Sequence, residues 1–389
     1  MTPADSPAAP ADWPARADEA ARSVTRLFGQ RLFFLPGTHI AAVARPSSRL
    51  KNLFRPWHYW WQAHYVDCLV DTGRRELGSA TSPGSRFDGA NRPSAGKLAS
   101  QLVTGIRLRN FLTVVNSYYD DMAWLALSTL RLEKLAEETR KPGRRRNASV
   151  RKSLALQFDS ASTDDLGGGT FWSTKRDFKN TPATAPVALY FARTGSTARA
   201  QGLLDWLDAK LFDPVQGLYL DGLRISKTGE VVVEGAIYTY NQGPVLGALL
   251  ELGGQPNLDR AATLVDAVDR TLTRPAANSA GIPSTVLRCD GTGDGGLFTG
   301  ILARYLALAA VDRRLPAVTR ATAARLVTDT AGAFWSGRRT VTEGETHIFS
   351  VHPETPASQT YPPGAAVELS TQLQAWMVLE AAATVHAGN

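Results

Sequence analysis

The feature that most constrains the fold of this chain is a pair of helical patterns that returns roughly every 55 to 70 residues. In each unit a strongly apolar helical pattern is followed by a break and then by a more polar, amphipathic one. This spacing suits a helix, a turn, a return helix and a connecting loop. The apolar patterns begin near Arg55, Asp120, Ala185, Asn241, Gly296 and Leu369.

The end of the chain indicates how these units close. The sixth apolar pattern, residues 369–383, has no second helix after it, and the amphipathic pattern over residues 13–28 can supply that partner. Six helix pairs closed into a ring make an all-α (α/α)6 barrel. We therefore predict a single barrel domain over residues 13–389, preceded by a disordered N-terminal tail over residues 1–12.

Strand patterns are scarce in this sequence. The one β-branched run is Glu-Val-Val-Val-Glu at residues 230–234, which predicts a short strand. Residues 217–221 are its expected hairpin partner.

The charge and cysteine content exclude several classes of site. The chain carries a formal net charge of +7, and much of the excess lies in residues 140–147 and in Arg151 and Lys152. This basic run contains Pro and Gly and no interleaved aromatic residue, so we interpret it as a solvated loop rather than a nucleic-acid contact. Attraction to an anionic envelope surface stays open. Cys68 and Cys289 stand alone, which excludes a zinc motif or a disulfide framework.

The start of the sequence shows no basic and apolar segments of the kind that make a secretory signal. No apolar stretch approaches the roughly 20 residues that a membrane-spanning helix needs. We therefore expect a cytoplasmic protein, or an extracellular or envelope-associated one if another route exports it.

Residues 115–124, Val-Asn-Ser-Tyr-Tyr-Asp-Asp-Met-Ala-Trp, place two adjacent carboxylates among aromatic residues where a loop leads into a helix. Such a pair suits acid/base or nucleophilic work on a sugar, because one carboxyl must hold a proton while the other stays ionised. An isolated Asp-Asp at a helix start is ordinarily a cap for free N–H groups. Here the flanking aromatic residues and the rest of the chain favour a catalytic pair, Asp120 and Asp121.

Three further loops precede apolar helices at the same position in their units. They are residues 167–182, with three glycines, Trp172 and Lys179-Asn180; residues 238–243, Tyr-Thr-Tyr-Asn-Gln-Gly; and residues 289–298, which hold Asp294. Each has a structural interpretation of its own: a tight glycine turn, a helix cap at Asn241, or an acidic loop without the ligand spacing of a calcium site. Their shared position instead predicts that they converge on one rim of the ring.

These motifs together resemble glycoside hydrolase family 76, the endo-α-1,6-mannanase family. The resemblance rests on Tyr-Tyr-Asp-Asp-x-Ala-Trp at residues 118–124, the glycine, Trp172 and Lys179-Asn180 motif, Tyr-x-Tyr-Asn-Gln-Gly at residues 238–243, and Phe-x-Gly-Ile with Arg-Tyr-Leu between residues 298 and 306. They follow the family's order over roughly residues 50 to 380. The chain departs from the family's pattern at Met122, Leu125 and residues 179–184, which leaves subsite contacts and the preferred substrate length open.

The resemblance implies an (α/α)6 fold and retaining, endo-acting hydrolysis of α-1,6-linked mannan. Asp120 would be the nucleophile and Asp121 the general acid/base. The ligand would be α-1,6-mannan or a manno-oligosaccharide, with no cofactor, no metal and no nucleic acid, and the protein would be a monomer. The expected substrate-binding residues are Tyr119, Trp124, Trp172, Asn180, Tyr240, Asn241, Gln242 and Asp294.

Other functions fit parts of the same sequence. A glycan transglycosylase would use the same covalent intermediate with a sugar acceptor, and a non-catalytic mannan-binding protein could use the same barrel. A terpene cyclase would need an Asp-rich motif that Tyr118 and Trp124 interrupt. His58, His64, His347 and His352 lie in separate segments without a metal-binding spacing, so we expect them to be exposed or hydrogen-bonded.

Overall fold

The computed structural model describes residues 11–46, 57–78, 86–141, 144–277, 283–341 and 346–388, without the side chains of Arg144 and Arg145. The predicted tail therefore lies almost wholly outside the described residues, as does the expected helix start near Arg55. The first described helix, α1, begins at Trp13, where the sequence pattern places it.

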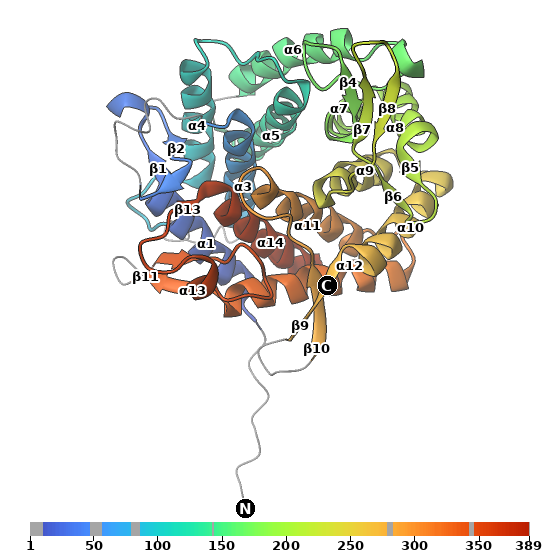
Figure 1. Ribbon diagram of the computed structural model, residues 1–389. Coiled ribbons are helices and arrows are strands. Elements are labelled where there is room, and N and C mark those ends of the chain that lie inside the picture. Colours follow the sequence, from blue (N-terminus) through green and yellow to red (C-terminus); the bar gives the residue numbers. More distant parts are fainter. Residues whose placement is uncertain are drawn as a thin grey trace, which may run out of the picture.

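Six helices form an inner ring in which each contacts the next and the last contacts the first (Figure 1). Their apolar character extends around the whole helix, since both sides are covered by protein. In chain order they are α3 (Tyr59–Gly78), α5 (Tyr119–Glu138), α7 (Thr181–Arg193), α9 (Thr239–Leu252), α11 (Gly295–Val311) and α14 (Leu369–Gly388).

A second set of helices covers this ring from outside, each one packed on the inner helices beside it. They are α1 (Trp13–Phe28), α4 (Ala95–Arg109), α6 (Arg144–Ala161), α8 (Thr197–Leu211), α10 (Gln255–Thr271) and α12 (Ala317–Ser336). Helix α1 packs against α14 and α3, so the first helix pairs with the last and closes the ring. The predicted (α/α)6 barrel is thus confirmed, and so is the pairing of residues 13–28 with the C-terminal helix.

Small residues set how closely the inner helices approach. A Cβ on Gly247 of α9 would come within 2.5 Å of the Tyr305 ring on α11, and one on Gly300 of α11 would lie 2.9 Å from Gln374 Cα on α14. A real Cβ atom essentially never lies closer than 3.0 Å to another heavy atom of this kind. These glycines therefore allow α9, α11 and α14 to pack at backbone contact.

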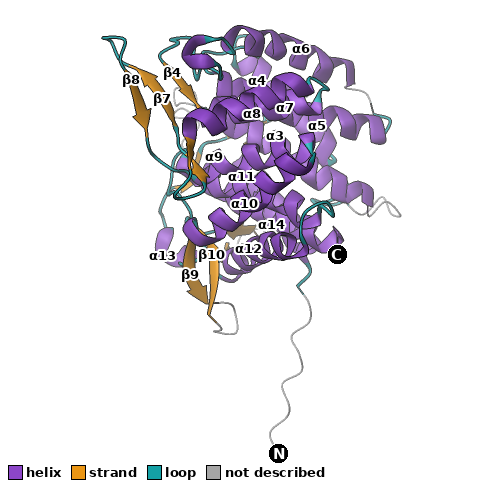
Figure 2. Cartoon of the chain, turned by 90° about the vertical axis from the view of Figure 1, so that its right-hand side faces the viewer, coloured by secondary structure: helices purple, strands orange, loops and turns teal. Residues whose placement is uncertain are grey.

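Short strands lie at one end of the barrel. Figure 2 shows β4, β7, β8, β9 and β10 along one side of the molecule. The largest sheet has the order β4-β7-β8, with all neighbours antiparallel. Its strands are β4 (Phe178–Asn180), β7 (Gly222–Ile225) and β8 (Val231–Glu234). The remaining strands form two-stranded ladders: β1 (Gly29–Gln30) with β2 (Ile40–Ala41), β3 (Ala44–Arg45) with β13 (Val367–Glu368), β5 (Phe212–Asp213) with β6 (Leu218–Tyr219), β9 (Thr273–Ala277) with β10 (Pro283–Leu287), and β11 (Arg339–Val341) with β12 (Thr346–Ile348).

The predicted strand at residues 230–234 exists as β8, but its expected partner was wrong. Strand β8 pairs with β7, and residues 218–219 pair with β5 instead. The reason is the tight turn between Ile225 and Val231, which Gly229 allows by adopting a positive φ of 83°. This turn makes β7 and β8 the two strands of one hairpin. The sequence pattern also missed the other ladders, because strands of two to five residues carry too few positions for a period to show.

The basic segment after α5 is helical from residue 144 on rather than a loop, while Arg140, Lys141, Arg146 and Lys152 are exposed as a solvated segment requires. Helix α6 begins at Arg144, Asn147 is buried with 2% of its surface exposed, and Arg151 pairs with Glu133 of α5. Residues 142–143 lie outside the described part. The basic run is therefore mainly the start of an outer helix, packed against α5.

Ion pairs hold the inner ring together farther from the strand-bearing end. Arg131 of α5 and Arg304 of α11 both pair with Asp67 and Asp71 of α3. All four side chains are less than 20% exposed. Because α3 and α11 are not neighbours in the ring, this network crosses the barrel interior.

No described helix is both long and apolar enough to cross a lipid bilayer.

Candidate active site

The inner helices begin at the same end of the barrel, so the loops before them meet at one rim. Trp60 of α3 lies 6.5 Å from Tyr240 of α9 and 6.2 Å from Phe298 of α11, measured between ring centroids. The indole groups of Trp60 and Trp61 also donate to Oδ1 of Asp294, at 3.1 and 2.8 Å. Residues from loops far apart in sequence therefore share one space.

The two adjacent aspartates occupy different hydrogen-bond environments at the start of α5. Asp120 Oδ1 accepts a bond from the backbone N–H of Asp121 at 2.9 Å, and its Oδ2 accepts one from Trp172 Nε1 at 3.0 Å. Asp121 Oδ2 accepts a single bond, from Asn116 Nδ2 at 2.7 Å. Asn116 is itself fixed, because its Oδ1 accepts the backbone N–H of Tyr118 at 2.9 Å.

These environments separate the proton affinities of the pair. Burial raises the pKa of Asp120 to about 7, while the bonds from the Asp121 N–H and from Trp172 oppose that rise. Burial and then the charge of Asp120 raise the pKa of Asp121 well above its usual range. The bond from Asn116 opposes that rise, but it is a smaller effect than either. The proton shared by the pair is therefore held on Asp121, and Asp120 is the carboxyl that ionises first. This is the division of labour that paired glycosidase carboxylates require.

Trp172 is positioned by main-chain bonds on both sides. Its carbonyl accepts the N–H of Tyr119 at 2.8 Å, and its own N–H donates to the carbonyl of Phe178 at 2.7 Å. The Tyr118 ring lies 4.9 Å from the Trp172 ring. The indole N–H is thereby aimed at the start of α5.

Lys179 holds the glycine loop that carries Trp172. The side chain is fully buried, and its Nζ donates to the carbonyls of Thr163, Asp165 and Gly168 at 2.7 Å each. Gly169 has a φ of 75°, and a Cβ there would come within 2.7 Å of the Trp206 ring. The three glycines thus form a turn around Lys179 and against Trp206, which is the structural alternative noted for this motif.

Asn180 and Gln242 are both buried and both bonded to backbone. Asn180 Oδ1 accepts the N–H of Ala183 at 3.1 Å and so caps the start of α7. Gln242 accepts the N–H of Tyr219 at 2.9 Å and donates to the carbonyls of Tyr219 and Tyr238 at 2.9 and 3.1 Å. Their side-chain groups are engaged in shaping the rim, while the predicted sugar contacts of both residues stay predictions.

An aromatic surface lies beside the aspartate pair. The rings of Tyr240 and Phe298 stack with centroids 3.8 Å apart and planes 9° apart, and Tyr238 packs edge-on against Phe298. Burial, followed by the charges of Asp221 and Asp120, raises the pKa of the Tyr240 hydroxyl well above its usual range. Tyr240 therefore lies within electrostatic reach of the pair.

The remaining predicted residues fall into exposed and buried positions. Asp294 is 57% exposed and holds the two indoles described above, with His58 Nδ1 at 3.8 Å. Tyr119 and Trp124 are 3% and 4% exposed, and Trp124 lies beneath the rim with its ring 4.8 Å from His64. Asn241 is fully buried, with its Nδ2 3.5 Å from Asp221 Oδ1 and its own Oδ1 without a hydrogen-bond partner among the described residues.

Three residues at this rim were absent from the sequence-based set. Asp221 faces Asn241, and burial raises its pKa to about 6. Trp60 bridges Asp294 and the Tyr240 ring, and Asn116 holds Asp121. The aromatic run at residues 57–61, which opens the first inner helix, was a signal that could have identified Trp60. No local sequence pattern predicts that Asp221 lies at the rim, because its position there depends on the pairing of the adjacent strand β7 with β4.

His64 departs from the expectation for the histidines. It is only 3% exposed, and its Nε2 has no hydrogen-bond partner among the described residues. It packs between the rings of Trp60 and Trp124, and burial lowers its pKa well below the usual range, so it is neutral. His347 does follow the expectation of a bonded histidine, with Glu19 Oε2 2.7 Å from its Nε2.

The described part of the chain contains no cluster of three or more His, Cys, Asp or Glu side chains that could bind a metal ion. Cys68 and Cys289 are both buried and unpaired, and burial raises the pKa of each thiol. Neither thiol is near enough to ionisation to act as a nucleophile.

Comparison with solved structures identifies several similar proteins. The α-1,6-mannanase GH76A from Salegentibacter sp. HEL1_6 matches with a TM-score of 0.75 and 26% identity, over 96% of this chain and 100% of that one. An inactive variant of that enzyme, with two adjacent aspartates replaced by asparagine and α-1,6-mannotriose bound, matches at 25% identity over the same shares and with the same TM-score. The Lin0763 protein from Listeria innocua has a TM-score of 0.76 and 22% identity over 97% of this chain and 99% of its own, which shows a shared fold.

A search of curated proteins found no match. The family model described as glycosyl hydrolase family 76 matches residues 40–387, which is most of the chain. The barrel and the structural neighbours agree with that match. The chain is therefore a glycoside hydrolase that belongs to glycosyl hydrolase family 76.

Proposed function

We propose that this enzyme hydrolyses α-1,6-mannosidic linkages inside a mannan backbone, with retention of configuration at the anomeric carbon. The observation that carries the proposal is the Asp120–Asp121 pair, whose two carboxyls have separate hydrogen-bond partners and separate proton affinities at an aromatic rim. The substrate class is supported by the Salegentibacter enzyme, an α-1,6-mannanase with an inactive variant changed at two adjacent aspartates.

In the first step the ionised Asp120 carboxylate attacks the anomeric carbon, and the bond from that carbon to the glycosidic oxygen breaks. Asp121 gives its proton to the departing oxygen, so the leaving sugar carries a neutral hydroxyl. In the second step Asp121, now ionised, takes a proton from water as the water oxygen attacks the same carbon and releases Asp120. Two inversions give net retention.

The assignment of roles follows from the bonds that each carboxyl accepts. Trp172 and the Asp121 N–H both stabilise the charged form of Asp120, which suits a nucleophile that must be ionised. Asp121 retains its proton because burial and the neighbouring charge both disfavour its ionised form. A general acid needs that property at neutral pH.

We expect the sugar to contact the groups that remain open at the rim, namely Trp172, Tyr240 and Asp294. Stacked aromatic faces such as Tyr240 on Phe298 suit the apolar faces of pyranose rings. Tyr119, Trp124, Asn180 and Gln242 are buried, so we assign them the support of those groups. Asn241 lies beside Asp221, and its Oδ1 has no partner among the described residues, so we expect this oxygen to accept a hydrogen bond from the sugar.

The first experiment is mass analysis of the products from linear α-1,6-mannan for the wild type, Asp120→Asn and Asp121→Asn. Short manno-oligosaccharides from the wild type and none from either variant would support the proposal. The matched control is Asp259→Asn on the outer helix α10, which should retain wild-type activity. Wild-type protein that leaves the mannan intact would contradict the substrate assignment.

Two further readouts separate the finer parts of the proposal. Proton NMR of the first-formed product should show the α-anomer if configuration is retained. Early products of mixed length would indicate endo action, whereas mannose alone would indicate exo action. Products longer than an added oligosaccharide acceptor would instead establish transglycosylation, and substrate binding without any cleavage would leave a mannan-binding protein.

A further inference from the structure

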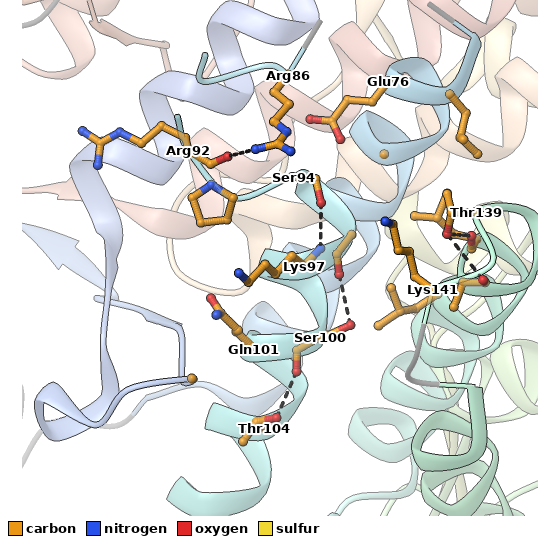
Figure 3. Close-up of a pocket in the computed structure, with 18 of the residues that line it drawn as sticks. Glu76, Arg86, Arg92, Ser94, Lys97, Ser100, Gln101, Thr104, Thr139 and Lys141 are labelled. Atoms are coloured by element: carbon orange, nitrogen blue, oxygen red, sulfur yellow. Dashed lines mark hydrogen bonds between the residues drawn. The ribbon is translucent and has the colours of Figure 1, made fainter. Parts of the chain in front are cut away.

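A pocket lies on the outer wall of the barrel between α4 and the end of α5 (Figure 3). Its volume is about 720 Å3. Glu76, near the end of α3, accepts the N–H of Ala95 at the first residue of α4, so the start of α4 lies at the end of the barrel opposite the rim. We call this pocket the α4–α5 groove.

Positive charge dominates the α4–α5 groove. Among the described residues of its lining the single carboxylate is Glu76, whose oxygens accept the backbone N–H groups of Phe87 at 3.3 Å and Ala95 at 3.2 Å. Burial raises the pKa of Glu76, while its two bonds from backbone N–H groups and the charge of Arg86 oppose that rise. The five cations in the lining are Arg86, Arg92, Lys97, Lys141 and Arg146.

The hydrogen bonds of Arg86 and Arg146 go to uncharged oxygens, although Arg86 also lies within electrostatic reach of Glu76. Arg86 Nη1 donates to the carbonyls of Ala90 and Arg92 at 2.9 and 2.7 Å, and Arg146 Nη1 donates to Thr104 Oγ1 at 3.0 Å. Lys97 and Lys141 form no ion pair with any described residue.

The ion pair of Arg92 is long, and its carboxylate has a second, closer partner. Arg92 approaches Asp88 at 3.8 Å, but Asp88 is held by Arg26 at 2.7 Å. Elsewhere arginines such as Arg75, Arg199 and Arg325 reach a carboxylate oxygen within 2.7 Å.

We propose that the α4–α5 groove is a binding site for a phosphate group carried by a small soluble ligand such as a phosphorylated sugar. Five cations line this hollow against one carboxylate among its described lining residues, so a multivalent oxyanion bound there would be attracted by their combined charge. Arginine and lysine donate charge-assisted bonds to phosphate oxygens, which strengthens such binding. The site stands apart from the rim and does not depend on the reaction proposed there.

The lining favours a compact ligand over a flat charged surface. Polar side chains lie between the cations, among them Ser100, Gln101 and Thr104 of α4 (Figure 3). The hydroxyls of Ser100 and Thr104 donate to the carbonyls of Gly96 and Ser100, so their oxygens can accept bonds from the hydroxyl groups of a sugar. Arg86 is held in place by its two bonds to carbonyl oxygens, so little side-chain freedom is lost on binding. Lys97 projects from the exposed surface of α4 and can close over a bound group.

The test is calorimetric titration of the full chain with inorganic phosphate and with mannose 6-phosphate, at constant ionic strength set by sodium chloride. We expect saturable binding of both probes, and a loss of affinity of about tenfold or more for Lys97→Glu, since each such group supplies a charge-assisted bond. Lys227→Glu, at the turn between β7 and β8, makes the same charge change far from the groove and should bind as the wild type does.

Mannose without phosphate and vesicles of phosphatidylglycerol in phosphatidylcholine complete the experiment. Mannose can bind at the rim, but that binding should be indifferent to Lys97→Glu. The proposal is overturned if neither phosphate probe binds, if Lys97→Glu and Lys227→Glu weaken binding equally, or if the protein binds only the vesicles. Thermal unfolding of each variant in chloride alone verifies that the variants are folded.

Discussion

The indole Nε1 of Trp172 lies 3.0 Å from Oδ2 of Asp120 and donates a hydrogen bond to it. The two residues are 52 positions apart in the chain, yet this contact adds to the bond from the Asp121 N–H in lowering the proton affinity of Asp120. It stabilises the ionised form of Asp120 and so separates that carboxyl from its neighbour Asp121. Two identical side chains at adjacent positions thereby acquire different chemistry.

Replacing Trp172 with phenylalanine should move the acidic limb of the activity profile. The variant keeps an aromatic ring but loses the donor to Asp120, so the pKa of Asp120 rises further above its value of about 7. We expect the acidic limb of kcat/KM against pH to move upward by about 1 pH unit. Trp335→Phe on the outer helix α12 is the control, and an acidic limb that stays in place in Trp172→Phe would contradict the role of the indole.

Replacing Asp121 with asparagine should stabilise the fold while it removes activity. The folded-state pKa of Asp121 is raised above its unfolded value, so the stability contributed by its protonated form is complete below the unfolded pKa and is lost as pH rises through the folded pKa. Asparagine cannot ionise and avoids that loss. We expect a free energy of unfolding about 1–2 kcal/mol higher than that of the wild type at pH 8 to 9.

Denaturant unfolding at pH 4 and at pH 9 measures this difference. Near pH 4 both proteins carry a neutral group at position 121, so their stabilities should converge. An Asp121→Asn variant that is destabilised at both pH values would show that the carboxyl is structural instead.

Replacing Lys179 with methionine should destabilise the protein and displace Trp172. The fully buried ammonium donates to several carbonyls of the glycine loop, which methionine would leave unpaired. We expect a loss of about 2–4 kcal/mol in the free energy of unfolding, because a buried acceptor left without a donor costs about 1–3 kcal/mol. Lys152→Met on the exposed surface of α6 should change it by less than about 0.5 kcal/mol. Equal stability of the two variants would refute the role of Lys179.

Replacing Arg304 with methionine should weaken the barrel at a point remote from the rim. Its guanidinium joins α11 to Asp67 and Asp71 of α3, and without it Arg131 alone faces two buried carboxylates. We expect a loss of about 3–5 kcal/mol, measured by denaturant unfolding. Arg313→Met, in the exposed turn after α11, is the matched control. A loss no larger than that of the control would show that the network contributes little.

Local patterns in the sequence were sufficient for the barrel and for the location of the aspartate pair. An apolar helix is recognised by a period that each segment carries within itself, and α5 begins at Tyr119, directly before the Asp pair. The packing of α1 against α14, which closes the ring, could be predicted because the helical patterns at the two ends of the sequence each lacked a partner. The motifs before the inner helices were informative because a repeated unit places equivalent loops at the same rim.

Only the tertiary structure decided which residues those loops bring together and which protons they hold. The position of Asp221 beside Asn241, the burial of His64 and the bond from Trp172 to Asp120 all join segments distant in sequence. The same holds for the cations of the α4–α5 groove, which come from different segments around α4 and α5. Burial and nearby charge set a pKa, and both depend on every chain segment packed around the group, so no local sequence pattern contains them.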